Sequence, residues 1–147
     1  MESIWTRTTL PVHPPLEGRH RCDAVVLGGG MAGILTAWVL RQHGPSVIVL
    51  EANRVGSGQT QNTNAKITAP HGLCYAKLID RLGAQDALRY ARAARQAVTD
   101  FRDIIAQEHI TCHLENLPSY LYSRYDPTTL KKERDAACDL GFGAEFV

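Results

Sequence analysis

Residues 24–35 read A-V-V-L-G-G-G-M-A-G-I-L, and this stretch decides the fold. Residues 23–27, with their continuous apolar centre, suit a parallel strand that is covered on both faces. Three glycines follow, and an apolar helical pattern then continues until Gly44 and Pro45 end it. Residues 46–50 form a second apolar run. The order strand, glycine turn, helix, strand predicts a βαβ unit, and the helix is so apolar on all sides that we expect it to be well buried.

The glycine turn matches the pattern G-x-G-x-x-G, and its place between a strand and a helix gives the match weight. Gly28 would make the tight turn out of the strand, and Gly30 would let a diphosphate approach the backbone. Gly33 would let the helix pack closely on the sheet. The helix N-terminus would offer unpaired N–H groups and a partial positive charge. The turn therefore predicts a dinucleotide site, with a purely structural glycine-rich turn as the alternative.

Glu51 closes the second apolar run, 18 residues after Gly33. A carboxylate at this place can accept hydrogen bonds from an adenosine ribose. It would repel a 2′-phosphate, so NADP is disfavoured. NAD and FAD both carry a free ribose diol, and Glu51 alone leaves both open.

The composition excludes several classes of protein. The chain has 147 residues, 44% of them hydrophobic, and a formal net charge of +1, which gives no electrostatic case for nucleic acid or an anionic membrane. We expect neither a signal peptide nor a membrane span. The cysteines at positions 22, 74, 112 and 138 fit no metal or disulfide spacing. We therefore expect no metal site and a cytoplasmic location.

Three regions are expected along the chain. Residues 1–21 contain Trp5 and several prolines and predict an extended arm. Residues 22–72 hold the βαβ unit and a long loop rich in Gly, Ser, Thr and Asn. Residues 73–147 predict helices over 73–82 and 84–108 and a β-hairpin of strands 111–114 and 120–124. A helix follows, capped by Asp126 and begun by Pro127, and a further strand starts at residue 143.

The segment after Glu51 resembles a known family. Residues 51–60, E-A-N-R-V-G-S-G-Q-T, resemble the second signature of the D-amino-acid oxidase-like FAD-dependent oxidoreductases. Residues 64–79, N-A-K-I-T-A-P-H-G-L-C-Y-A-K-L-I, are similar to a branch that often carries a C-terminal Rieske domain, as are S-I-W at 3–5 and D-P-T-T-L-K-K-E at 126–133. The resemblance implies an α/β fold with a Rossmann-like FAD-binding βαβ unit, followed by helices and the start of a mixed α+β substrate region.

The resemblance also implies roles for residues at matching positions. The FAD diphosphate would lie on the glycine turn, and Glu51 would bind the adenosine ribose. Ala52 and Arg54 would flank the adenine, and Gly58 and Thr60 would contact the phosphates or the ribityl chain. Asn64, Ala65 and Lys66 would lie toward the isoalloxazine ring, with Lys66 as a cation beside that ring. His71 could line the flavin site or be an ordinary loop residue. The full set of implied cofactor-binding residues is Gly28, Gly30, Met31, Ala32, Gly33, Glu51, Ala52, Arg54, Gly58, Thr60, Asn64, Ala65 and Lys66.

The implied activity is oxidation of a small amine or amino acid, with hydride transfer to flavin N5. Electrons would leave to an acceptor such as an iron–sulfur domain. Members of this family are much longer, so we expect a fragment or truncated product that is incomplete as an enzyme, and no catalytic residue is assigned. The alternatives are a non-catalytic nucleotide-binding remnant and an NAD-dependent dehydrogenase domain, although the Gly-Thr segment after Glu51 does not suit the latter.

Overall fold

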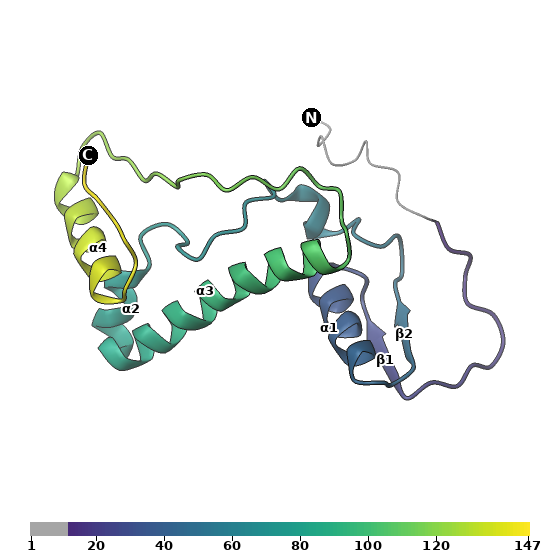
Figure 1. The fold of residues 1–147 in the computed structure, drawn as a ribbon. Helices are drawn as coiled ribbons and strands as arrows, with labels where there is room; N and C mark the ends of the chain where they lie inside the picture. Colours follow the sequence, from purple (N-terminus) through teal and green to yellow (C-terminus); the bar gives the residue numbers. More distant parts are fainter. Residues whose placement is uncertain (1–11) are drawn as a thin grey trace. The chain divides into compact units, whose positions relative to one another are not determined.

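The structure is a computed structural model, and it describes residues 12–147. The chain divides into two compact units, the first ending at Lys66 and the second comprising Ile67–Val147 (Figure 1). The sequence predicts this division after residue 72, a few residues later. The predicted arm lies partly outside the described residues, together with Trp5. Its described part, residues 12–21, forms neither helix nor strand.

The first unit contains the predicted βαβ arrangement. Strand β1 (Ala24–Leu27) leads into helix α1 (Met31–Gln42), and strand β2 (Val47–Leu50) follows. The two strands pair in parallel, with Ala24 opposite Val47 and Leu27 opposite Leu50. A short 3-10 helix, η2 (Gln59–Asn62), lies in the predicted long loop. These elements confirm a mixed α/β arrangement and the element order expected from the glycine turn.

Asp23 and Ser46 join the N-terminal ends of the two strands. The Asp23 carboxylate accepts hydrogen bonds from the Ser46 backbone N–H at 2.8 Å and from the Ser46 hydroxyl at 2.6 Å. The Asp23 N–H in turn donates to the Ser46 hydroxyl oxygen at 3.0 Å. These bonds fix the strand register, so the glycine turn and Glu51 come together at the opposite, C-terminal end of the sheet.

The expected burial of β1 on both faces and of α1 on all sides is wrong. In β1, Ala24 and Val26 are half-buried, whereas Val25 is 53% and Leu27 is 79% exposed. No residue of α1 is fully buried. The reason is geometric: successive strand residues point to opposite faces, and α1 packs on β1 and β2 as a single layer. Among the described residues, one face of this short sheet is therefore left exposed.

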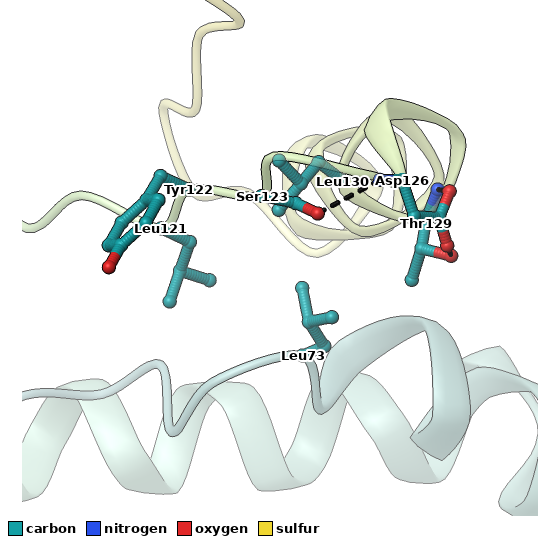
Figure 2. A pocket seen from close by; sticks show the side chains of 7 residues that line it. All are labelled: Leu73, Leu121, Tyr122, Ser123, Asp126, Thr129 and Leu130. Carbon is teal, nitrogen blue, oxygen red and sulfur yellow. Dashed lines mark hydrogen bonds between the residues drawn. The ribbon is translucent and has the colours of Figure 1, made fainter.

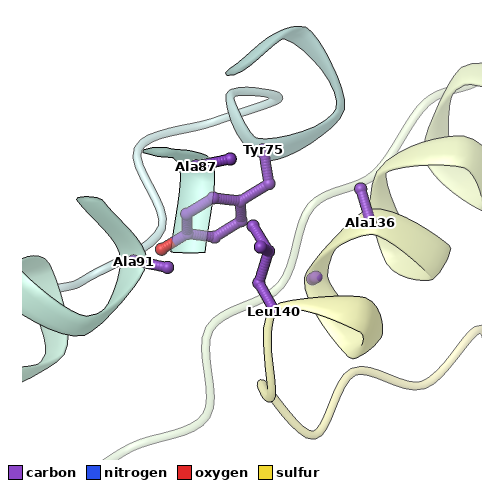
Figure 3. Close-up of a cluster of buried hydrophobic side chains, with 6 residues drawn as sticks. Tyr75, Ala87, Ala91, Ala136 and Leu140 are labelled. Atoms are coloured by element: carbon purple, nitrogen blue, oxygen red, sulfur yellow. The ribbon is translucent and has the colours of Figure 1, made fainter. Parts of the chain in front are cut away.

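The second unit is helical. It consists of α2 (Tyr75–Leu82), α3 (Ala84–Gln107) and α4 (Pro127–Asp139), and α2 packs against both of the others. Its core combines one large ring with small side chains, which let the helix backbones approach closely (Figure 3). The fully buried members are Tyr75, Ala87, Ala91, Ala136, Ala137 and Leu140. The Phe142 ring stacks on Tyr75 with ring centres 4.9 Å apart.

The helix predictions of the second unit hold, and the strand predictions do not. The Asp126 carboxylate caps α4 by accepting the Thr129 N–H at 3.0 Å, and Pro127 begins the helix, as expected. The predicted strands at 111–114, 120–124 and 143–147 are absent, because these residues form no helix or strand in the structure. A β-favouring sequence becomes a strand only by pairing with a neighbour, and the described part of the chain gives these segments none.

Candidate functional site

The glycine turn connects β1 to α1 in the tight path that its sequence predicts. Gly28 has a φ of +99°, which favours glycine, and its N–H donates to the Leu50 carbonyl at 2.7 Å. A Cβ atom on Gly33 would lie 1.9 Å from the Gly28 carbonyl oxygen. No side chain fits in this space, so the absence of one at Gly33 is what lets the helix begin this close to the turn.

Glu51 lies beside this turn, at the end of β2. One of its carboxylate oxygens accepts the Gly29 N–H at 2.7 Å, and the other accepts the Asn53 N–H at 2.9 Å. The bond from the Gly29 N–H, which has the larger effect, and the bond from the Asn53 N–H lower the pKa of the Glu51 carboxyl below its ordinary value. Glu51 is therefore an ionised carboxylate at neutral pH, and each of its oxygens keeps one further lone pair that can accept a hydroxyl donor.

The loop after Glu51 folds back onto the turn. The Gly56 N–H donates to the Gly29 carbonyl at 2.9 Å, and the Met31 N–H donates to the Thr60 hydroxyl at 3.1 Å. A Cβ atom on Gly30 would meet the same hydroxyl at 3.6 Å, an ordinary contact distance. The structure thus brings residues 28–33 together with Glu51 and Thr60, although Glu51 and Thr60 are 22 and 29 residues from their partners along the chain.

The remaining candidate residues lie on the surface. Ala52, Arg54 and Gly58 are exposed, and so is the segment Asn64, Ala65 and Lys66. The Lys66 N–H donates to the Asn64 side-chain oxygen at 3.1 Å, and Ala65 has a φ of +55°. This segment is held by local bonds, and in the described chain no hydrogen bond links it to the glycine turn. His71 is also exposed.

The first turn of α1 offers donors that suit a diphosphate. Its N-cap, Gly30, has no side chain to accept a hydrogen bond, and the Met31 N–H is bonded to Thr60. For the backbone N–H groups of Ala32 and Gly33, residues 12–147 supply no acceptor. Donors of this kind, with the positive end of the helix dipole, attract anions. The residues present therefore fit a dinucleotide diphosphate, with Glu51 placed to accept from hydroxyl groups.

Two residues of this site were missed in the sequence. Gly56 has a φ of +76° and anchors the loop to Gly29, and Asn53 supplies the second N–H to Glu51. The glycine-rich run V-G-S-G was a signal for Gly56, because a left-handed backbone favours glycine. No sequence signal identifies Asn53, because its contribution comes from the backbone.

A pocket of about 280 Å³ lies in the second unit (Figure 2). Leu73 faces α4 and the segment before it across this pocket, and the other lining residues are Leu121, Tyr122, Ser123, Asp126, Thr129 and Leu130. Three of its polar residues are bonded among themselves, because Asp126 accepts the Thr129 N–H and the Ser123 hydroxyl accepts the Asp126 N–H. The pocket therefore presents no converging polar groups to a ligand.

Over the described residues, no group of three or more His, Cys, Asp or Glu side chains could hold a metal ion. His109, Cys112 and His113 are all exposed. Within residues 12–147, none of the helices combines the length and the apolar character that crossing a bilayer requires.

Comparison with known proteins links this chain to a family. The model of the family described as "DAO: FAD dependent oxidoreductase" matches residues 23–147. YhfW of Bacillus subtilis, a protein named as a Rieske 2Fe-2S iron–sulfur protein, is 34% identical over 149 residues, covering 99% of this chain and 29% of that protein. The tRNA 5-methylaminomethyl-2-thiouridine biosynthesis bifunctional protein MnmC of a Polaromonas species is 32% identical over 104 residues, 69% of this chain and 16% of that protein.

A shorter match extends the comparison to a named flavoprotein. The flavin-containing amine oxidase B of Cavia porcellus is 43% identical over 49 residues, 31% of this chain and 9% of that protein. No solved structure matches the chain. The chain thus spans 29% or less of the length of these three relatives.

Proposed function

Because the chain belongs to the DAO family of FAD-dependent oxidoreductases, we propose that its first unit binds the adenosine diphosphate half of FAD in a Rossmann-like manner. One observation carries this proposal: the backbone donors of Ala32 and Gly33 begin the helix that leaves the glycine turn, and the carboxylate of Glu51 is bonded to Gly29 in the same turn. A diphosphate and a ribose are the two parts of a dinucleotide that such groups would bind.

The candidate residues divide the cofactor between them in this proposal, with Ala52 and Arg54 beside the adenine and Gly58 near Thr60. The glycine turn holds the diphosphate through backbone N–H groups, and Glu51 accepts from the adenosine ribose. Thr60 orders the loop over the turn and reaches the phosphates or the ribityl chain. The next segment leads toward the isoalloxazine ring, where the charge of Lys66 favours an anionic reduced flavin. The complete set is Gly28, Gly30, Met31, Ala32, Gly33, Glu51, Ala52, Arg54, Gly58, Thr60, Asn64, Ala65 and Lys66.

We propose oxidation of a small amine or amino acid as the activity of the complete protein. Flavin supplies, when bound, the hydride acceptor for such a reaction. The match to a flavin-containing amine oxidase supports this substrate class. The match to a relative named as a Rieske protein supports an iron–sulfur domain as the electron acceptor. The free cysteines at positions 22, 74, 112 and 138 suit a reducing, cytoplasmic location.

Titration with FAD and, separately, with ADP tests the proposal. We expect both to bind, and the complex with FAD to be yellow after gel filtration. Glu51→Gln removes the charge and turns an amide donor toward the N–H of Gly29 or Asn53, so FAD binding should weaken about ten- to a hundredfold. Glu115→Gln, at an exposed position of the second unit, is the matched control and should bind as the wild type does. Failure of both FAD and ADP to bind would refute the site.

A further inference from the structure

Gly29 lies in the middle of the glycine turn and is buried, whereas Gly28 and Gly30 are half-buried. The pattern G-x-G-x-x-G leaves its position open, and its φ is not positive, so neither the motif nor the backbone conformation requires glycine there. Its N–H donates to the Glu51 carboxylate at 2.7 Å, and its carbonyl accepts the Gly56 N–H at 2.9 Å. Both backbone polar groups of Gly29 are thus bonded to the segment that follows β2.

A side chain at position 29 would collide with Glu51. A Cβ atom there would lie 3.1 Å from the Glu51 Cβ, 3.4 Å from the Glu51 Cγ and 3.2 Å from the Val55 Cγ2. Carbon atoms in contact are normally about 3.5–4.0 Å apart. To relieve the contact, the stem of the Glu51 side chain would have to move by a few tenths of an ångström, and the carboxylate at its end would move with it.

The glycine at position 29 therefore acts on Glu51 in two ways. The missing side chain lets the Glu51 stem lie against the turn, and the Gly29 N–H fixes one of the carboxylate oxygens. The Asn53 N–H fixes the other oxygen at 2.9 Å. A carboxylate held in this way presents its remaining lone pairs in fixed directions, and a hydrogen bond from a hydroxyl group weakens steeply when its direction is wrong.

We propose that Gly29 is a positioning residue for ribose recognition: because it has no side chain, the Glu51 carboxylate lies where it can accept from the ribose hydroxyl groups of the nucleotide. The inference rests on the proposed function, because it takes the adenosine ribose as the ligand of Glu51. It assigns Gly29 no contact with the ribose. Gly29 and Glu51 both belong to the first unit and are bonded to each other directly.

Two nucleotides separate the ribose from the diphosphate in a test of this role. ADP carries both ribose hydroxyls, and 2′,3′-dideoxy-ADP carries neither, while the diphosphate is the same in both. The wild-type chain should bind ADP about ten- to a hundredfold more tightly, because only ADP can donate to the Glu51 carboxylate. The ratio of the two dissociation constants is the readout, since a change that weakens the whole site cancels from it.

Gly29→Ala should reduce this ratio to about threefold or less and leave the dissociation constant of dideoxy-ADP within about threefold of the wild-type value. Glu51→Ala removes the acceptor and should make the two constants nearly equal, and adding Gly29→Ala to it should change the ratio no further. Ser46→Ala is the control for stability, because it removes a bond at the opposite end of the same sheet. It should lower the urea midpoint and keep the wild-type ratio.

The possible failures can be told apart. If the wild type discriminates between the nucleotides and Gly29→Ala keeps the ratio, the positioning role is refuted while the proposed function stands. The same holds if Ser46→Ala also lowers the ratio, since the loss would then follow stability alone. A wild type that binds both nucleotides equally refutes the assignment of the ribose to Glu51, and this inference with it. A wild type that binds neither FAD nor ADP refutes the whole site.

A second variant covers the case in which Gly29→Ala does not fold. Combining Gly29→Ala with Val55→Ala removes the contact at the Val55 Cγ2 and keeps the contacts at the Glu51 Cβ and Cγ. The same loss of the ratio is expected from this double variant, and a wild-type ratio would refute the positioning role.

Discussion

Gly30 and Gly33 lack side chains for different physical reasons. A Cβ atom on Gly33 would lie 1.9 Å from the Gly28 carbonyl oxygen, so this glycine is required by the contact between turn and helix. A Cβ atom on Gly30 would meet only the Thr60 hydroxyl, at 3.6 Å, and the backbone there is ordinary, with a φ of −77°. The fold tolerates a side chain at position 30, and we infer that the ligand does not.

Gly33→Ala is expected to destabilise the first unit by about 3 kcal/mol, because the helix must move away from the turn. Urea unfolding followed by circular dichroism measures this. Gly143→Ala is the control, since a Cβ atom there meets nothing within 4 Å. A Gly33→Ala variant as stable as the wild type would mean that the helix does not pack as closely as described.

Gly30→Val is expected to leave the urea midpoint close to that of the wild type and to abolish detectable binding of FAD and of ADP. The branched side chain would occupy the path of the diphosphate toward the N–H groups of Ala32 and Gly33. Gly143→Val provides the matched control for adding the same side chain. Retained binding of either compound by the folded Gly30→Val variant would contradict the placement of the diphosphate.

The sequence predicts the glycine turn well because its contacts are close along the chain or set by steric limits. Glu51 was expected beside the turn and lies there, but its bonds to the N–H groups of Gly29 and Asn53 were not foreseen. Glu133 of α4, whose carboxylate accepts the N–H groups at the start of α2, was not predicted at all. Its partners are 57 to 59 residues away and are backbone groups, which carry no residue-specific signal.

At the scale of elements, α2 contains an unusual buried group. The Tyr75 side chain is 1% exposed, and its hydroxyl has no hydrogen-bond partner among the described residues. Its ring packs between Ala87, Ala91 and Leu140 (Figure 3). Burial, the largest cause, raises the pKa of Tyr75 to about 12, so the hydroxyl stays protonated at neutral pH.

Tyr75→Phe is therefore expected to stabilise the second unit by about 1 kcal/mol, because an unsatisfied buried hydroxyl costs about 1–3 kcal/mol and the ring packing is kept. Thermal and urea unfolding of the two proteins would show the difference. Tyr90→Phe, at a side chain that is 41% exposed, should change little and serves as the control. A loss of stability in Tyr75→Phe would instead reveal a bound partner for the hydroxyl.

Helices were easier to predict than strands in this chain. The apolar stripe at spacings of three and four and the Asp126-Pro127 start identified α3 and α4, because a helix satisfies its backbone within itself. The predicted strands at 111–114 and 120–124 had suitable residues, but a strand needs another strand beside it. The same reason explains why β1 and β2 were found correctly: each is the partner of the other.

At the scale of the whole molecule, acid is expected to destabilise the chain through carboxylates in both units. Hydrogen bonds from Ser46 lower the pKa of Asp23, and the bond from its hydroxyl has a larger effect than the bond from its N–H. Hydrogen bonds from Thr129 lower the pKa of Asp126 in the same order. For a carboxyl whose folded pKa is depressed, the stabilisation is complete above the unfolded value. It is lost as the pH falls through the folded value.

The urea midpoint should therefore stay constant from neutral pH down to about 5 and fall below about 4, where the ordinary values of Asp and Glu lie. Asp23→Asn and Ser46→Ala are each expected to lower stability at neutral pH. Each should also make the decrease of the urea midpoint at acid pH smaller than in the wild type. The double variant should add little to either single one, because both changes act on the charge-assisted bond from the Ser46 hydroxyl to the Asp23 carboxylate. An acid slope unchanged by Asp23→Asn would show that this carboxylate contributes nothing.

The sheet of the first unit, as far as the structure describes it, has two strands of four residues each. So small a sheet is marginally stable in water. A ligand that binds at the C-terminal ends of both strands would shift the folding equilibrium toward the folded state by mass action. At a cofactor concentration one hundred times the dissociation constant the gain is about 2.7 kcal/mol. Calorimetric melting is thus expected to separate into two peaks as FAD is added. The melting temperature of the first unit should rise, and that of the second unit should stay unchanged.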